Sequence, residues 1–298
     1  MSEKLKSWFL LILLSCIWGS SFFLINLGLF DEHHNARLPA DELGALRVAI
    51  AFLALSPLFI KNIKYLSRTN VIYLAIAGVC GNGLPPFLFA YAETYLNSSI
   101  VGMLNSLVPL FTILIGVIFF KFQITRTHLL GIGIAIIGTY LIVKEQFESI
   151  AISFDSLKPM LAVTLATVCY ATSLNVIKHK LGNLKSTAIT SLSFFMIAPF
   201  AFGYLAYSPF ITRVQTQENV MEGIGAILIL AILGTAVAVL LFNKLIKMSS
   251  PIFASSVTYF IPIVAIIIGW AIGENITTFQ ISGMSILIIG VLVINKGH

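Results

Sequence analysis

Long apolar runs alternate with short polar segments along almost the whole chain. A helix needs about 20 apolar residues to cross a hydrocarbon core of about 30 Å, and ten runs come near that length. These runs cover residues 8–28, 43–60, 71–91, 98–120, 127–143, 158–177, 187–206, 224–243, 251–272 and 279–294. The two shortest, at 127–143 and 279–294, are rich in glycine, which permits close helix packing. The pattern predicts an all-α membrane protein with ten transmembrane helices.

A helical hairpin occurs twice in the sequence. Residues 104–144 and residues 257–296 each contain an apolar segment with an internal proline, a short polar turn and a glycine-rich apolar segment. Pro109 and Pro262 correspond at an offset of 153 residues, and the later glycines of the two copies correspond at 152. Internal similarity at a fixed offset indicates a duplicated structural unit.

The duplication divides the chain into two halves. We expect a first five-helix repeat at residues 1–146, a linker at 147–154 and a second five-helix repeat at 155–298. Because five spans is an odd number, the two repeats must enter the membrane from opposite sides. Inverted repeats of this kind place a substrate site near the middle of the membrane and permit alternating access.

Composition and charge agree with this topology. The 298 residues are 58% hydrophobic and only 10% charged, whereas about 25% of the residues of a soluble domain are charged. With the N-terminus in the cytoplasm, thirteen of the seventeen basic residues in loops and at helix ends lie on the cytoplasmic side, as the positive-inside rule requires. This distribution predicts that both termini are cytoplasmic. It also accounts for the net charge of +6 without a nucleic-acid partner.

Several segments carry a family resemblance. They are WGSSFFLIN from Trp18, LRVAIAF around Arg47, LNSLVP with Pro109, and FIPIVAIIIGWAIGE with Pro262 and Glu274. In their order, spacing and duplication these segments resemble the EamA family of the drug/metabolite transporter superfamily. The resemblance implies a ten-helix inner-membrane carrier of small metabolites, often an exporter of amino acids or related compounds. One departure is Lys121, which stands where the family commonly has glutamate.

Charged residues are rare within the predicted spans, and Arg47 is the deepest of them. The span centres contain no acidic residue, and Glu93 is expected beyond the outer end of the third span. An ionisable residue inside a membrane is a candidate functional residue. Arg47 either extends to the outer interface or faces a cavity. In a cavity it would attract a carboxylate or phosphate, or would pair with Glu42 or Glu93.

Polar and aromatic residues at mid-depth complete the candidate site. A buried amide is costly unless it is paired, so these side chains should face the bundle interior, where helix packing and substrate contact are equally good explanations for each. The substrate-binding candidates are Trp18, Arg47, Asn82, Tyr91, Asn105, Tyr170, Asn175 and Tyr259. Proline and glycine also predict a broken or kinked third helix. The candidate kink or hinge residues are Gly81, Pro85, Pro86, Pro109 and Pro262.

These features favour a secondary carrier that works by alternating access and exports an amino acid or a similar metabolite. The same fold would also serve nucleobases, sugars or drugs. A membrane-embedded enzyme or lipid-modifying protein is the alternative from another class, but it would need convergent acids, histidines or metal ligands at one depth. We expect no cofactor, no metal and no ATP site. The expected partners are a small-molecule substrate and the lipid bilayer, with the chain as a monomer or homodimer.

Overall fold

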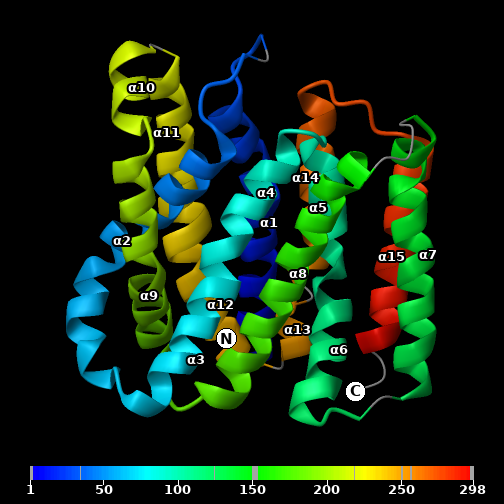
Figure 1. Ribbon diagram of the computed structural model, residues 1–298. Coiled ribbons are helices and arrows are strands. Elements are labelled where there is room, and N and C mark those ends of the chain that lie inside the picture. The colour runs from blue at the N-terminus through cyan, green and yellow to red at the C-terminus, as the bar shows by residue number, and fades with distance from the viewer. Residues whose placement is uncertain are drawn as a thin grey trace.

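The computed structural model describes residues 3–33, 35–123, 125–149, 154–217, 219–249, 251–255 and 257–295. Within these ranges the chain is helical and has no β-sheet; an isolated bridge joins Phe30 to Ala36. The helices run roughly parallel to one another along one axis (Figure 1). Four of the eight residues of the predicted linker at 147–154, residues 150–153, lie outside the described part of the chain, and the other four belong to helices α7 and α8.

The first half of the chain contains seven α-helices and three short irregular helical segments. They are α1 (Glu3–Leu29), α2 (Ala40–Asn62), η1 (Ile63–Tyr65), α3 (Arg68–Gly78), η2 (Val79–Gly83), α4 (Leu84–Glu93), α5 (Ser98–Leu104), η3 (Asn105–Leu107), α6 (Val108–Phe120) and α7 (Arg126–Ser149). The second half has a similar order. Its elements are α8 (Phe154–Lys180), α9 (Ser186–Tyr207), α10 (Phe210–Thr216), α11 (Val220–Ala231), η4 (Ile232–Val237), α12 (Ala238–Met248), α13 (Pro251–Ser255), α14 (Val257–Ala271) and α15 (Thr278–Asn295).

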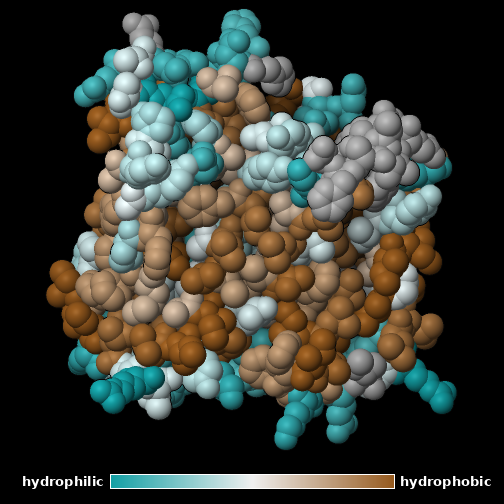
Figure 2. Space-filling model, viewed as in Figure 1, coloured by the Kyte–Doolittle hydropathy of each residue, from teal (hydrophilic) through white to brown (hydrophobic). Residues whose placement is uncertain are grey.

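Eight helical segments of the described chain are long and apolar enough to cross a membrane. They are Leu5–Leu29, Ala40–Tyr65, Arg68–Glu93, Ser98–Phe120, Leu157–Lys180, Ser186–Tyr207, Val220–Met248 and Phe253–Ala271. Two further apolar helices, Arg126–Ile142 and Thr278–Gly290, are shorter. Figure 2 shows a broad hydrophobic belt with hydrophilic residues at its two ends. The protein is therefore a multi-pass membrane protein.

Two of the spans contain a π-helical turn. The irregularity that glycine and proline predict in the third span is η2, a π-helix at Val79–Gly83. Pro85 and Pro86 follow in the first turn of α4, where a missing backbone N–H costs least. A second π-helix, η4 at Ile232–Val237, interrupts the equivalent span of the second half. The sequence analysis did not predict this second turn, because no proline marks it.

The helices α7 and α15 pack tightly against each other at one side of the bundle (Figure 1). Glycine permits this close approach. A Cβ atom at Gly138 would lie 2.5 Å from the backbone nitrogen of Leu287, and one at Gly290 would lie 2.6 Å from the backbone nitrogen of Ala135. Small residues at a helix contact are a common device in membrane proteins.

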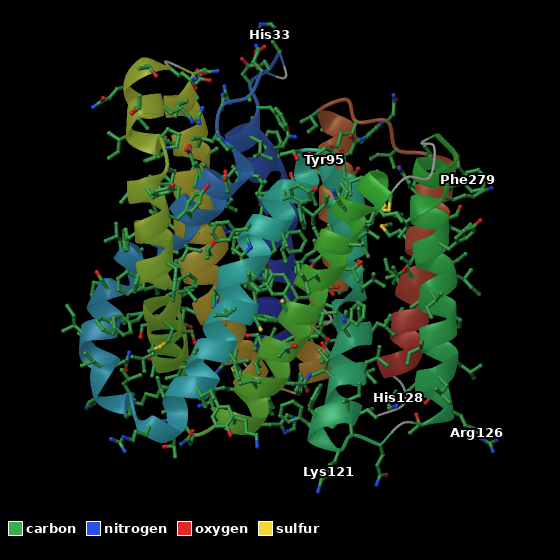
Figure 3. All side chains as sticks on the ribbon, viewed as in Figure 1. His33, Tyr95, Lys121, Arg126, His128 and Phe279 are labelled. Atoms are coloured by element: carbon green, nitrogen blue, oxygen red, sulfur yellow. The ribbon has the colours of Figure 1, made fainter. Side chains whose placement is uncertain are left out.

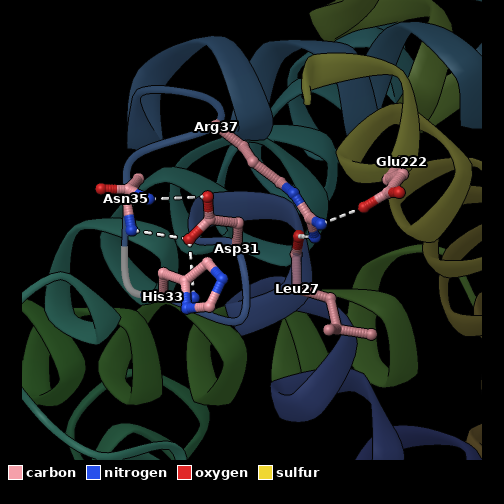
Figure 4. A network of polar contacts seen from close by, with 6 residues as sticks. All are labelled: Leu27, Asp31, His33, Asn35, Arg37 and Glu222. Atoms are coloured by element: carbon pink, nitrogen blue, oxygen red, sulfur yellow. Dashed lines mark hydrogen bonds and ion pairs between the residues drawn. The ribbon is translucent and has the colours of Figure 1, made fainter. Parts of the chain in front are cut away.

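A polar network stabilises the connection between α1 and α2 (Figure 4). Asp31 accepts hydrogen bonds from the backbone nitrogens of His33 and Asn35 at 2.9 and 2.8 Å, and from Asn35 Nδ2 at 2.9 Å. The side-chain hydrogen bond from Asn35 is the main cause of the lowered pKa of Asp31. The ionised form of Asp31 therefore stabilises this turn. The turn is therefore expected to loosen only as the pH falls through that lowered pKa.

Arg37 joins this connection to the second half of the chain. Its guanidinium donates a hydrogen bond to the carbonyl oxygen of Leu27 at 3.0 Å and forms an ion pair with Glu222 near the start of α11 (Figure 4). A similar ion pair links Arg213 of α10 to Glu42 of α2, with Nε and Oε2 3.1 Å apart. Both pairs hold elements of the two halves together at one end of the bundle.

The basic residues Lys121 and Arg126 lie at one end of the bundle, and His33 and Tyr95 lie at the other (Figure 3). The helix α1 begins and α15 ends at the same end as Lys121 (Figures 1 and 3). Lys121 itself follows α6 in a left-handed conformation, with φ of 60°. The position where the family commonly has glutamate is thus the C-cap residue of a helix in this chain.

A candidate transport cavity

One cavity lies between elements of both halves. It contains about 920 Å³ of space, counting its opening to solvent. Its walls are mainly apolar and aromatic. They comprise Trp18, Ser21, Phe22, Ile25, Arg47, Gly81, Asn82, Pro86, Phe89, Asn105, Val108, Tyr170, Ser173, Leu174, Ile177, Gly234, Thr235, Val239, Phe242, Asn243, Ile246, Thr258 and Ile261.

The cavity residues correspond in pairs between the two halves. On α1 and α8 the offset is 152 residues, and on the other walls it is 153. The pairs are Trp18 with Tyr170, Ser21 with Ser173, Phe22 with Leu174, Ile25 with Ile177, Gly81 with Gly234, Asn82 with Thr235, Pro86 with Val239, Phe89 with Phe242, Asn105 with Thr258, and Val108 with Ile261. Almost every residue of one half that lines the cavity therefore has its counterpart on the opposite wall.

Two contacts, each between a serine of one half and a glycine of the other half, show how the π-helical turns are packed. A Cβ atom at Gly81 would lie 2.6 Å from Ser173 Oγ, and one at Gly234 would lie 3.0 Å from Ser21 Oγ. Each serine thus packs against the π-helix of the other half. A residue larger than glycine at either position would have to displace the serine hydroxyl. π-Helical turns of this kind are frequent at functional sites.

Matched aromatic contacts lie beside these turns. Trp18 of α1 meets Phe242 of α12 edge-on, with ring centroids 4.8 Å apart. The corresponding pair, Tyr170 of α8 and Phe89 of α4, is stacked at 5.8 Å. Aromatic rings therefore line both sides of the cavity.

Arg47 breaks this correspondence. It lies on α2, is only 7% exposed, and its Nε donates a hydrogen bond to Thr235 Oγ1 at 2.7 Å. The side chain is therefore buried in the bundle and does not extend to the outer interface. Among the described cavity residues, Arg47 is the only one that carries a charge.

The structure brings five of the eight predicted substrate-binding residues together. Trp18, Arg47, Asn82, Asn105 and Tyr170 all line the cavity. Two of the predicted hinge residues also line it. These are Gly81 and Pro86.

The other three candidates for substrate binding lie outside the cavity walls. Tyr91 packs edge-on against Tyr95, with ring centroids 5.3 Å apart. Asn175 is fully buried and its Nδ2 donates to the carbonyl oxygen of Thr112 at 3.0 Å, which ties α8 to α6. Tyr259 is buried on α14. We interpret these three as packing residues in the arrangement that the structure describes.

The remaining predicted hinge residues also lie away from the cavity walls. Pro85 is in the first turn of α4, and Pro109 follows η3 in the first turn of α6. Pro262 lies inside α14. Their positions at or near helix irregularities are compatible with bending, and their role as hinges stays a prediction.

The sequence analysis missed the small polar residues of the walls. Ser21, Ser173, Thr235 and Thr258 all line the cavity, yet each lies in a mainly apolar run and looks like an ordinary packing residue. The repeat offset would have found them, because each has a counterpart that also lines the cavity. Asn243 was missed as well; its Nδ2 donates to Thr190 Oγ1 at 2.8 Å.

The indole of Trp18 stabilises η4. Its Nε1 donates to the carbonyl oxygen of Gly234 at 2.9 Å, and a π-helical turn leaves such carbonyls short of backbone partners. We expect Trp18→Phe to lower the initial transport rate severalfold, since the loss of one buried hydrogen bond costs about 0.5–1.5 kcal/mol. The same change at Trp270, which is 78% exposed, should have no effect. Equal losses in both variants would show that the bond has no part in transport.

The family is settled by comparison with known proteins. The model of the EamA-like transporter family matches residues 6–144 and again residues 157–296. The chain belongs to the EamA-like transporter family. The two matches coincide with the two halves that supply the paired cavity walls. This EamA-like protein therefore has its cavity at the junction of two matching units.

Two relatives of this EamA-like transporter are distant but match nearly its whole length. An "Uncharacterized inner membrane transporter YedA" from Escherichia coli (strain K12) is 23% identical, with 96% of this chain and 90% of the relative covered. A "Probable amino-acid metabolite efflux pump" from Salmonella typhimurium is also 23% identical, with 97% and 94% covered. One solved crystal structure shares the fold, with a TM-score of 0.69 at 13% identity over 97% of this chain and 96% of that one. The protein is a multi-pass inner-membrane transporter.

Proposed function

We propose that this EamA-like transporter is a secondary carrier that exports an amino acid or a related carboxylate metabolite by alternating access. The observation that carries the proposal is the cavity, whose walls are matched residues of both halves with Arg47 as a buried positive charge. Two nearly equivalent walls permit two nearly equivalent states, one open to each side of the membrane.

The proposal includes ten spans in two inverted repeats with both termini in the cytoplasm. The eight long apolar segments and the two shorter apolar helices, Arg126–Ile142 and Thr278–Gly290, supply the ten spans. The tight pairing of α7 with α15 supports the count, because it places the two short helices in corresponding positions. The common end of α1, α15 and Lys121 supports termini on one side (Figures 1 and 3).

The chemistry of the walls supports an amino acid as the substrate. Arg47 suits a carboxylate, since a charge-assisted hydrogen bond is among the stronger polar contacts. The aromatic faces of Trp18 and Tyr170 suit an ammonium group, which is attracted to such rings. The name of the Salmonella relative, an amino-acid metabolite efflux pump, supports the same substrate class.

Neutral polar residues of the walls favour a second group of substrates. Asn82, Asn105 and Thr258 line the cavity, and the Oδ1 atom of Asn105 is buried without a hydrogen-bond partner. An unpaired buried amide oxygen favours a ligand that donates a hydrogen bond. Nucleobases, sugars and many drugs carry such donors, and they form the second pool to be tested.

Counterflow tests the proposal. Liposomes containing the purified protein are loaded with unlabelled amino acids, and labelled amino acids are added outside. Counterflow needs no driving gradient, so the unknown coupling ion does not affect it. We expect labelled amino acids to accumulate transiently in protein-containing liposomes and not in protein-free liposomes.

Two further results are informative. If amino acids fail and the nucleobase, sugar or drug pool accumulates, the substrate class is wrong and the carrier assignment stands. If well-folded protein transports neither pool, the carrier assignment is wrong for both groups of substrates.

A further inference from the structure

A buried carboxylate lies next to the cavity. Glu93 is the last residue of α4, one helical turn after the cavity residue Phe89, and is only 3% exposed. The sequence analysis expected it beyond the outer end of the span. The structure instead buries it, because α5 begins five residues later and brings Ser98 onto it. Glu93 Oε2 accepts a hydrogen bond from Ser98 Oγ at 2.9 Å, whereas the buried Oε1 has no hydrogen-bond partner.

A second carboxylate approaches from the other half of the chain. Glu274, in the turn after α14, accepts a hydrogen bond from the backbone nitrogen of Ser99 at 3.2 Å, and so caps the N-terminus of α5. It lies against α14, since a Cβ atom at Gly269 would be 2.6 Å from Glu274 Oε2. The hydroxyl of Ser99 is also buried without a partner. The two halves therefore meet around two carboxylates.

Charge interactions connect Glu93 to the cavity. Arg47 of α2 attracts Glu93 and Glu274 repels it. Tyr170 of α8 also interacts electrostatically with Arg47. Helix α5 contributes the hydroxyl of Ser98, which is not titratable near neutral pH. A change of charge at Glu93 is therefore felt at Arg47, on the cavity wall.

The environment of Glu93 favours a bound proton. An ionised carboxylate is costly in an apolar interior unless both oxygens have partners, and Glu93 Oε1 has none. Repulsion by Glu274 adds to that cost, whereas attraction by Arg47 reduces it. A substrate carboxylate at Arg47 would cancel this attraction. The balance at Glu93 then moves further towards the neutral acid.

We propose that Glu93 is a proton-binding site that is linked to the binding of a carboxylate substrate at Arg47. This inference rests on the proposed function and identifies the proton as the ion that is coupled to transport. One proton from water binds Glu93 Oε1 when the substrate binds and returns to water when the substrate leaves. Ionised Glu93 competes with the substrate for the charge of Arg47, so proton and substrate raise each other's affinity by the same factor. Each solute molecule then crosses with one proton, so export is driven by the outward gradient of the solute and not by an inward proton gradient.

The test is the pH dependence of counterflow, with equal pH on both sides of the liposome membrane. The probe is the labelled mixture of amino acids at varied total concentration. For the wild type we expect the half-saturation concentration to fall about fivefold or more from alkaline to acidic pH, within the usual range of coupling between two sites. Glu93→Gln, which resembles the protonated acid, should give a low half-saturation concentration at every pH. The control Glu222→Gln changes a 74% exposed carboxylate and should keep the wild-type pH dependence.

Three results would overturn the proposal. The first is a wild-type half-saturation concentration that does not change with pH, and the second is a pH dependence that persists in Glu93→Gln. The third is a dependence on sodium in place of pH that Glu93→Gln abolishes, which would make Glu93 a sodium ligand.

Infrared spectroscopy tests the proton site without any substrate. As the pH is lowered, wild-type protein in lipid should gain the carbonyl band of a buried protonated carboxylic acid, and Glu93→Gln should lack this band at every pH. If no such band appears even at acidic pH, Glu93 does not bind a proton and the proposal is wrong. Absence of counterflow with the band present would refute the proposed function for amino acids and still support a protonated Glu93, so the two failures are distinguishable.

Discussion

Arg47→Ala is expected to raise the half-saturation concentration for amino acids about 10- to 150-fold. A hydrogen bond to a charged group contributes about 1.5–3 kcal/mol, and each 1.4 kcal/mol is tenfold in affinity. Arg47 is the buried cation of the described cavity wall, so its loss removes the attraction for a substrate carboxylate. The measurement is the concentration dependence of counterflow, together with the amount of folded protein in the membrane.

Two further variants separate charge from structure. Arg47→Lys keeps the positive charge and loses the planar guanidinium. Its half-saturation concentration should therefore lie between those of the wild type and Arg47→Ala. Thr235→Val removes the hydroxyl that accepts the bond from Arg47 Nε and keeps the charge, so it should change the half-saturation concentration much less than Arg47→Ala. An unchanged half-saturation concentration in Arg47→Ala, at wild-type abundance, would remove Arg47 from the substrate site.

Gly138→Ala is expected to destabilise the protein by about 1–3 kcal/mol, the usual cost of overpacking. The added Cβ would lie 2.5 Å from the backbone nitrogen of Leu287 and 2.6 Å from the carbonyl oxygen of Gly283. Backbone atoms cannot rotate away, so α7 and α15 would have to separate. Thermal unfolding of purified protein in detergent measures the effect as a lower apparent Tm.

Gly133 provides the matched control on the same helix. A Cβ atom there meets nothing within 4 Å, and alanine is the better helix former by about 1 kcal/mol. Gly133→Ala should therefore leave the apparent Tm unchanged or raise it, so the two variants should differ in sign. If Gly138→Ala is as stable as Gly133→Ala, the close packing of α7 against α15 is not a source of stability.

The paired cavity walls show that the two sequence repeats contact each other at the cavity. Ser21 and Ser173 each contact a π-helical turn of the other half, beside Gly234 and Gly81. Each π-helical turn is thus held by a residue from the opposite repeat. A shift of one half against the other would change both contacts together, as the proposed alternating access requires.

The local sequence pattern was sufficient to predict that the protein lies in a membrane, that it is helical, and which family it resembles. Apolar runs near 20 residues can be satisfied only as membrane helices, because backbone groups in lipid must pair within the segment. The glycines and prolines at residues 81–86 likewise indicated an irregular turn, which is the π-helix η2. The count of ten spans stays a prediction, as eight helices meet the length criterion and two are shorter.

The local sequence pattern was insufficient where the role of a residue depends on the direction in which its side chain points from the helix. Tyr91, Asn175 and Tyr259 were predicted to share a site with Trp18 and Asn82, but the cavity walls do not include these three residues. A sequence gives the height of a residue in the membrane and leaves its direction open when the helix is apolar all round.

The sequence by itself therefore determined that this chain folds in lipid as two related sets of helices with few charges inside, because composition and periodicity act residue by residue. Only the tertiary structure decided which polar groups share one cavity, that Arg47 is buried against Thr235, and that Glu93 lies beneath Ser98. These contacts join residues far apart in the chain or across a turn. They depend on the rotation and approach of whole helices, which no single apolar run specifies.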